Sequence, residues 1–127
     1  MKNINKVLDI LEETYPDAKC ELDYTTPFEL LVATILSAQC TDVRVNKVTG
    51  EMFKKYNTPM DFAKLSIDEI QEEIKTCGLY KSKAEKIKST SEKICNEYNG
   101  EVPDNLEDLT KLPGVGRKTA NVVLSNA

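Results

Sequence analysis

Hydrophobic residues recur at helical spacing along most of the chain, and polar capping residues separate the periodic segments. A first periodic segment covers residues 4–15 and ends at Pro16. The run from Phe28 to Ala38 is apolar on nearly all sides, which is typical of a buried helix at the centre of a domain. No segment shows the two-residue alternation of a strand, so the pattern predicts an all-α fold.

Capping signals divide the rest of the chain into further helices. Three pairs have the spacing of a capping box, namely Thr26 with Glu29, Ser66 with Glu69, and Ser82 with Glu85. We expect helices to begin after these boxes and also at Thr41, Thr58 and Asp104. Gly78 and Gly100 fit the position that directly follows a helix.

The most informative segment reads Leu-Pro-Gly-Val-Gly-Arg-Lys-Thr-Ala-Asn-Val-Val and covers residues 112–123. A Pro-Gly-x-Gly turn precedes a helical stretch that opens at Arg117. We expect Gly114 and Gly116 to adopt positive φ and to let the backbone approach another molecule. The turn and the first helical residues would offer N–H groups at the positive end of a helix dipole, which is a seat for a phosphate.

Composition narrows the possible chemistry. The chain of 127 residues contains no histidine, which excludes Ser-His and Cys-His nucleophile systems and histidine metal sites. Its four cysteines, Cys20, Cys40, Cys77 and Cys95, match no zinc or iron–sulfur spacing, and we interpret them as reduced, mostly buried thiols. Because the sequence lacks a membrane-spanning apolar run and a signal peptide, we expect a cytoplasmic protein without a membrane partner.

Charge is distributed unevenly. The net charge of −4 disfavours nucleic acid as a partner. Residues 75–93, however, contain six lysines and two glutamates, and residues 111–127 contain three basic residues and no acidic one. These two segments could form one basic face, and a solvated helix surface is the alternative.

Lys118 is a candidate nucleophile. It lies opposite the apolar stripe of its helix and is predicted to face a cleft or water; that stripe consists of Ala120, Val123, Leu124 and Ala127. A lysine forms a Schiff base only as the neutral amine, and at an ordinary pKa of about 10.4 it is under about 0.1% neutral at pH 7. The helix dipole and Arg117 together lower that pKa by too little, so desolvation or a nearby base must add the rest. A plain exposed lysine is the alternative.

Two other segments carry candidate binding residues. Gln39 lies at the junction between the apolar helix and the next one, where its amide could hydrogen-bond a base or simply be a polar loop residue. Leu79 is an apolar residue in a turn rimmed by lysines. It could wedge into a base stack or pack on its own helix as a hydrophobic staple.

These three segments together resemble endonuclease III, a family of helix-hairpin-helix DNA glycosylases. Residues 112–120 look like the family's hairpin and the start of its second helix, and residues 37–42 and 78–84 look like its two DNA-probing loops. The resemblance covers the chain in order from about Leu22 to Ala127. It implies a helix-hairpin-helix glycosylase fold with a six-helix barrel domain at 21–127, the hairpin motif at about 105–127, and an N-terminal helix at 1–20 that belongs to a cluster domain.

The resemblance implies a base-excision repair enzyme that acts on damaged double-stranded DNA and flips out an oxidised pyrimidine. Lys118 would attack the sugar C1′ and form a Schiff base, and β-elimination would nick the strand. Gln39 would fill the gap and Leu79 would wedge from the opposite strand. The hairpin residues would bind the DNA backbone, with a monovalent cation there; they are Gly114, Val115, Gly116, Arg117 and Thr119.

The family also has a catalytic Asp and a [4Fe–4S] cluster on four cysteines, and both would lie after Ala127. We therefore expect a truncated chain that holds no metal ligands, binds DNA weakly and turns over poorly. We expect the full-length protein to be a monomer, nucleoid-associated if bacterial, while the exposed last helix leaves a dimer of this chain open. A non-catalytic helix-hairpin-helix module, in which Lys118 only neutralises phosphate, is the main alternative. The adenine-mismatch branch lacks the attacking lysine, so Lys118 counts against it.

Overall fold

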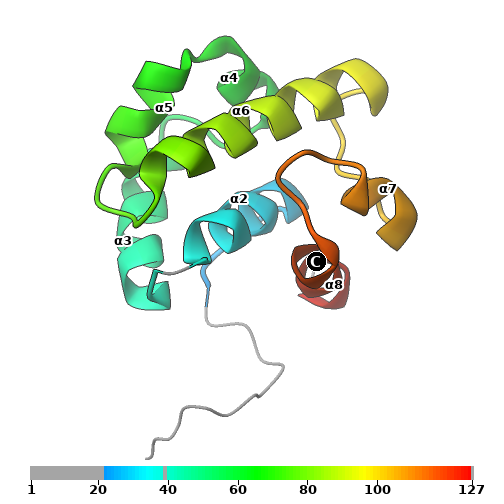
Figure 1. Cartoon of the computed structure of the whole chain (residues 1–127), viewed down its shortest axis with the longest axis horizontal. Coiled ribbons are helices and arrows are strands. Elements are labelled where there is room, and N and C mark those ends of the chain that lie inside the picture. The colour runs from blue at the N-terminus through cyan, green and yellow to red at the C-terminus, as the bar shows by residue number, and fades with distance from the viewer. Residues whose placement is uncertain (1–21, 39, 127) are drawn as a thin grey trace, which may run out of the picture.

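A computed structural model describes residues 22–38 and 40–126, and this part of the chain contains helices and no strand (Figure 1). The all-α prediction is confirmed. The helices are α2 (Pro27–Ser37), α3 (Asp42–Met52), α4 (Pro59–Lys64), α5 (Ile67–Ile74), α6 (Tyr80–Glu97), α7 (Leu106–Thr110) and α8 (Arg117–Asn126). The predicted helix over 4–15, Gln39 and Ala127 lie outside the described residues. None of the described helices has the length and apolar character needed to cross a membrane.

Helix α2 lies at the centre of the fold, between α6 and α8 in Figure 1. Thr26 caps it by accepting a hydrogen bond from the N–H of Glu29, and Pro27 occupies its first turn. Leu30, Leu31 and Leu36 are fully buried, and burial of each leucine side chain contributes about 1.5–3 kcal/mol. The apolar run from residue 28 thus forms the core helix that the sequence predicts.

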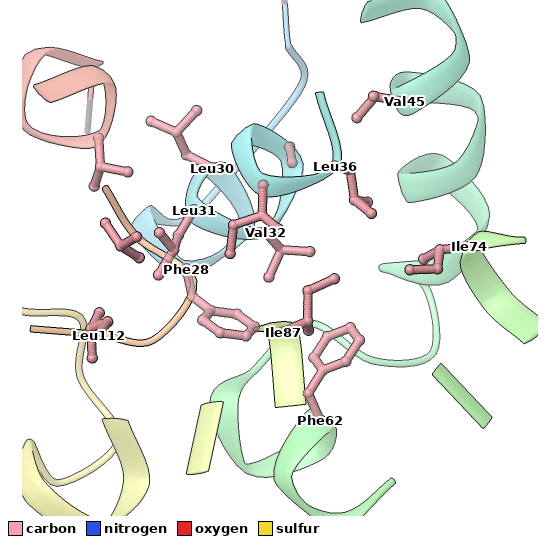
Figure 2. Close-up of a cluster of buried hydrophobic side chains, with 14 of the residues drawn as sticks. Phe28, Leu30, Leu31, Val32, Leu36, Val45, Phe62, Ile74, Ile87 and Leu112 are labelled. Atoms are coloured by element: carbon pink, nitrogen blue, oxygen red, sulfur yellow. The ribbon is translucent and has the colours of Figure 1, made fainter. Parts of the chain in front are cut away.

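Helix α6 is the longest of the described helices and covers one side of the hydrophobic core. It packs on α4, α5 and α2 (Figure 1), and its buried stripe includes Ala84, Ile87 and Ile94. Figure 2 shows Ile87 grouped with Phe28 of α2 and Phe62 of α4, whose ring centroids lie 5.7 Å apart. This long amphipathic helix therefore packs on the central helix α2 as well as on α4 and α5.

Two predicted helix starts are wrong. Helix α6 begins at Tyr80, one turn closer to the loop than the predicted box at Ser82, because the N–H of Lys83 already donates to the carbonyl of Leu79 (3.0 Å). Helix α7 is capped by Asn105 rather than Asp104, and it has only 5 residues instead of two turns. The short amide of Asn105 accepts from the N–H of Asp108 at 2.8 Å, which leaves Asp104 before the cap.

The other predicted helix boundaries are largely correct. The capping box at Ser66 and Glu69 is present with both of its hydrogen bonds. Helix α6 ends as predicted, with Asn99 and Gly100 at positive φ and the N–H of Gly100 bonded to the carbonyl of Ile94 (3.0 Å). At the end of α5 the left-handed residue is Leu79 (φ 58°), one position later than the expected Gly78.

Glu29 is a charged residue in the core, with only 5% of its surface exposed. Its carboxylate accepts hydrogen bonds from the N–H (2.8 Å) and hydroxyl (3.0 Å) of Thr25 and from the amide of Asn57 (3.3 Å). It therefore does not close the predicted box on the N–H of Thr26. Instead it ties the chain before α2 to the turn before α4.

Glu29→Ala should lower the free energy of unfolding by about 2–3 kcal/mol, because it leaves buried donors on Thr25 and Asn57 without an acceptor. Chemical denaturation followed by circular dichroism measures the change. Glu51→Ala is the control, since Glu51 is exposed and should change stability by no more than about 0.5 kcal/mol. Equal effects of the two substitutions would contradict the role given to Glu29.

Candidate nucleic-acid interface

The hairpin between α7 and α8 packs directly against α6. The N–H of Gly114 donates to the hydroxyl of Thr90 (3.0 Å). A Cβ at residue 114 would lie 2.9 Å from the Cβ of Lys86, so a side chain there would push the hairpin off the helix. The expected positive φ at Gly114 and Gly116 is wrong, because Gly100 is the only glycine with positive φ among the described residues. Gly114 is needed for a close approach to the protein's own helix.

The hydrogen bonds of the hairpin show which donors remain for an anion. The N–H of Gly114 is used by Thr90, and the N–H of Val115 donates to the carbonyl of Leu112 (3.1 Å). The first intrahelical bond of α8 runs from Ala120 to the carbonyl of Gly116 (2.9 Å). The four N–H groups of residues 116–119 therefore have no intrahelical acceptor. Of the donors that the sequence predicts for a phosphate, in the turn and the first helical residues, only those of residues 116–119 at the start of α8 therefore remain.

Lys118 is exposed on this first turn, as predicted. With Arg117, Asn121 and Ser125 it lines a hollow of about 580 Å³ along α8. On the opposite side of the helix Ala120 and Val123 are buried, whereas Leu124, which was assigned to the same stripe, is 37% exposed. The hydroxyl of Tyr24 donates to the carbonyl of Asn126 (2.5 Å) and fixes the far end of the helix.

The described part of the chain offers no carboxylate that could accept the proton of Lys118. No carboxylate there forms an ion pair with Lys118. Asp108, one of the acidic residues before the hairpin, bonds the amide of Asn105 (3.0 Å) and lies 3.6 Å from the ammonium of Lys111. The neighbouring acids therefore stabilise α7 rather than serve the candidate nucleophile.

Leu79 has an unusual combination of exposure and backbone conformation. It is 58% exposed, and its φ of 58° and ψ of 36° place it in the left-handed region. The left-handed conformation costs a residue with a Cβ about 1–2 kcal/mol, and the side chain is too exposed for its burial to offset much of that cost. The alternative that Leu79 packs on its own helix as a staple is therefore wrong, and its side chain is presented to solvent at the tip of the turn.

Lys83 joins the two predicted probing loops, a role that the charge pattern of the sequence does not predict. Its side chain is only 2% exposed, and its Nζ donates to the carbonyls of Leu36 (2.8 Å) and Ala38 (2.5 Å). Burial lowers the pKa of Lys83 from its ordinary value. Its helical phase does predict burial, since Lys83 is in phase with Ile87 and Ile94 on the apolar face of α6.

Residues 75–93 supply few free lysines to the basic face that this segment could form. Lys83 points inward, and Lys88 donates to the carbonyls of Ala63 (2.9 Å) and Leu65 (2.6 Å) at the end of α4. Lys75 and Lys93 have glutamate partners on their own helices. Lys81 and Lys86 stay exposed and free of ion pairs in the described region, and Lys86 lies beside the hairpin.

The described residues include no group of three or more Cys, Asp or Glu side chains that could hold a metal ion. Cys77 is buried, while Cys40 and Cys95 are half-buried and all three are free thiols. The described residues therefore do not include a ligand set for an iron–sulfur cluster. The hairpin carbonyl of Leu112 accepts one hydrogen bond from Val115 and has a second lone pair that a cation could use.

Comparison with known proteins places this geometry among DNA repair enzymes. Residues 32–124 match the HhH-GPD superfamily of base excision DNA repair proteins. Endonuclease III of Bacillus subtilis (strain 168) is 50% identical over 127 residues, which is 100% of this chain and 58% of that protein. Endonuclease III of Escherichia coli (strain K12) is 48% identical over 122 residues, 96% of this chain and 58% of that protein. The chain thus spans less than two thirds of the length of these relatives.

Solved structures agree with the sequence comparison. A trapped covalent intermediate of endonuclease III with DNA, an estranged-adenine complex, superposes with a TM-score of 0.82 at 54% identity over 87% of this chain and 52% of that one. A non-covalent endonuclease III–DNA complex gives 0.83 at 54% identity over 88% and 52%. A thermostable thymine-DNA glycosylase gives 0.74 at 34% identity over 78% and 46%. The resemblance and the helix-hairpin-helix glycosylase fold are confirmed.

Lys83→Met should destabilise the chain by about 1–3 kcal/mol, because two carbonyls lose their buried donor. Lys81→Met is the matched control on the same helix turn, and its exposed side chain should contribute no more than about 0.5 kcal/mol. Urea denaturation of both variants measures the difference. If Lys83→Met left the free energy of unfolding unchanged, the loop after α2 would hold its position without this lysine.

Leu79→Gly should raise the free energy of unfolding by about 0.5–1 kcal/mol, because glycine adopts the left-handed conformation without strain. Asn99→Gly provides the comparison at a second left-handed position (φ 56°), where asparagine already tolerates the conformation and the gain should be smaller. Thermal denaturation reports both values. A less stable Leu79→Gly chain would mean that the leucine is held by packing rather than strained.

Proposed function

Because the chain belongs to the HhH-GPD superfamily of base excision DNA repair proteins, we propose that it carries the nucleophile and the DNA-gripping surface of a glycosylase with abasic-site lyase activity. The observation that carries this proposal is the position of Lys118. It is exposed, free of ion pairs among the described residues, and placed in the first turn of α8, directly after the hairpin, where the N–H groups lack intrahelical acceptors.

In the proposed reaction the neutral amine of Lys118 attacks C1′ of a flipped, oxidised pyrimidine nucleoside. The C1′–N bond breaks and the base leaves with a proton, while the amine nitrogen becomes the iminium of a Schiff base. Loss of a C2′ proton then expels the 3′ phosphate and nicks the strand. The trapped covalent complex of a relative with DNA supports a covalent route.

The gripping surface is proposed to combine three segments. The N–H groups of residues 116–119 would bind a backbone phosphate, and Arg117 and Thr119 would add side-chain contacts. Gly114 and Val115 would shape that turn, since their own N–H groups are already used. Leu79 would enter the base stack, which agrees with its exposed, strained conformation. Gln39 would fill the space left by the flipped base.

The proton acceptor for Lys118, the preferred damaged base and the domain limits (1–20 and 21–127) are part of the same proposal. The described carboxylates do not supply the acceptor, so we assign it to a residue outside the described part, as the family's Asp implies. A monovalent cation at the hairpin would take the carbonyl of Leu112 as a ligand and would neutralise phosphate charge. No step depends on it, or on the iron–sulfur cluster.

A second candidate is a non-catalytic DNA-binding module. The lack of a carboxylate partner for Lys118 among the described residues favours it. In that case Lys118 would only neutralise a phosphate, and its removal would reduce the salt slope of DNA binding by about one. The two candidates therefore differ in whether a covalent bond forms.

Borohydride reduction in the presence of an abasic-site duplex distinguishes them. A chain completed with the family's catalytic Asp should give a covalent adduct that denaturing electrophoresis detects, because hydride fixes the Schiff base, and Lys118→Ala should abolish it. Lys64→Ala is the control, since Lys64 is exposed and lies in α4, outside the segments proposed to contact DNA. No adduct from the completed chain, or an adduct that survives Lys118→Ala, would reject the lyase proposal.

A further inference from the structure

We propose that Lys86 binds a second backbone phosphate of the lesion-bearing DNA strand, next to the phosphate assigned to the first turn of α8. This assignment rests on the gripping surface of the proposed function and not on its lyase chemistry. Lys86 is exposed on α6, and the hairpin before α8 packs against this helix (Figure 1). The lysine and the hairpin are far apart in sequence, so the fold alone brings them together.

The stem of Lys86 lies directly against the backbone of the hairpin. A Cβ at Gly114 would come within 2.9 Å of the Cβ of Lys86 and within 3.1 Å of the hydroxyl oxygen of Thr90. The N–H of Gly114 donates to the same hydroxyl (3.0 Å). Gly116, where the N–H groups without an intrahelical acceptor begin, follows two residues later. The base of the Lys86 side chain is therefore fixed beside the proposed phosphate seat.

The charge of Lys86 is not balanced by a neighbouring acid. It forms no ion pair with a described residue. The residues three and four positions away on the helix include no acid; they are Ser82, Lys83, Ser89 and Thr90. The hairpin brings no carboxylate either, since residues 111–118 contain none. Three other lysines of α6 each have a glutamate four residues later; they are Lys81, Lys88 and Lys93.

A second cation lies close to Lys86, toward the interior of the protein. Lys83 is buried one turn earlier on α6. Burial lowers the pKa of Lys83, and the charge of Lys86 acts in the same direction. Two neighbouring lysines without a carboxylate repel each other, and an anion bound at Lys86 offsets this repulsion. The excess positive charge beside the hairpin therefore favours a polyanion such as DNA.

The side chain and its position select a phosphate of one particular strand. A lysine ammonium is a compact point charge with three rotatable donors on a flexible stem, which suits it to a phosphate. Lys86 and the seat at residues 116–119 are tied to the same hairpin. In the proposed reaction Lys118, within that seat, attacks a nucleoside of the lesion-bearing strand. Lys86 is therefore assigned to the same strand.

The first test measures binding of an abasic-site duplex by fluorescence anisotropy over a range of salt concentrations. Lys86→Met keeps an unbranched stem against the hairpin but removes the charge. It should weaken binding at low salt by about fivefold and reduce the salt slope by about one, whereas Lys86→Arg should retain both values. Urea denaturation should give the same midpoint for Lys86→Met and the unsubstituted chain, because the stem still packs.

Lys64→Met is the matched control. Lys64 is exposed on α4, which lies on the other side of α6 from the hairpin in Figure 1. This substitution removes the same charge from the chain, so it should change the affinity and the salt slope much less than Lys86→Met does.

A second test locates the phosphate. Single phosphates in either strand of the duplex are replaced by a neutral methylphosphonate, and each duplex is bound to the unsubstituted chain and to Lys86→Met. At one position of the lesion-bearing strand the two changes should be non-additive, so that Lys86→Met no longer weakens binding there. A lysine with a purely structural role would weaken binding to every duplex alike.

Equal affinities and salt slopes for Lys86→Met and Lys64→Met would overturn the assignment. Additive effects at every position, or coupling only to the opposite strand, would overturn it as well. If the unsubstituted chain does not bind abasic duplex, the gripping surface of the proposed function fails, and the assignment of Lys86 fails with it. Duplex binding without a borohydride adduct rejects the lyase chemistry alone, and the phosphate scan then still decides on Lys86.

Discussion

The buried ammonium of Lys83 is the interaction on which the candidate DNA-binding surface depends. Removing a charged amine from water is costly unless strong acceptors surround it, and here the carbonyls of Leu36 and Ala38 are those acceptors. The same two carbonyls end α2 and begin the loop that leads to α3. The end of the core helix, the following loop and the first turn of α6 therefore hold their relative positions through one side chain.

Helix α6 also fixes the position of the hairpin. Two turns after Lys83, the hydroxyl of Thr90 accepts from the N–H of Gly114, and Lys86 leaves room there only for a glycine. The loop after α2 and the hairpin are thus both positioned by one rigid helix. This is how residues far apart in sequence can act on one ligand. The strained Leu79 lies at the start of that helix. An exposed apolar side chain in a costly conformation contributes nothing to the fold, and such strain persists mainly where a site uses it.

Much of this arrangement could be predicted from local sequence patterns. The Thr26 cap, the apolar run of α2, the Ser66 box and the stop at Gly100 depend on neighbouring residues, and all are present. The features that were missed depend on contacts distant in sequence. The sequence predicts positive φ at Gly114, but the residue is a glycine because α6 occupies the space that a side chain would need. The charge pattern places Lys83 on the surface, although its phase on the helix is that of a core residue.

We propose that one DNA duplex contacts both the first turn of α8 and the Leu79 turn at the start of α6. Amide chemical shifts during titration with an abasic-site duplex test it most directly. We expect the largest changes at residues 116–119 and at Leu79, and smaller ones at Gly114 and Val115, whose N–H groups are already bonded within the chain. Changes centred instead on the hollow around Pro59 and Val102, or spread evenly over the chain, would contradict it.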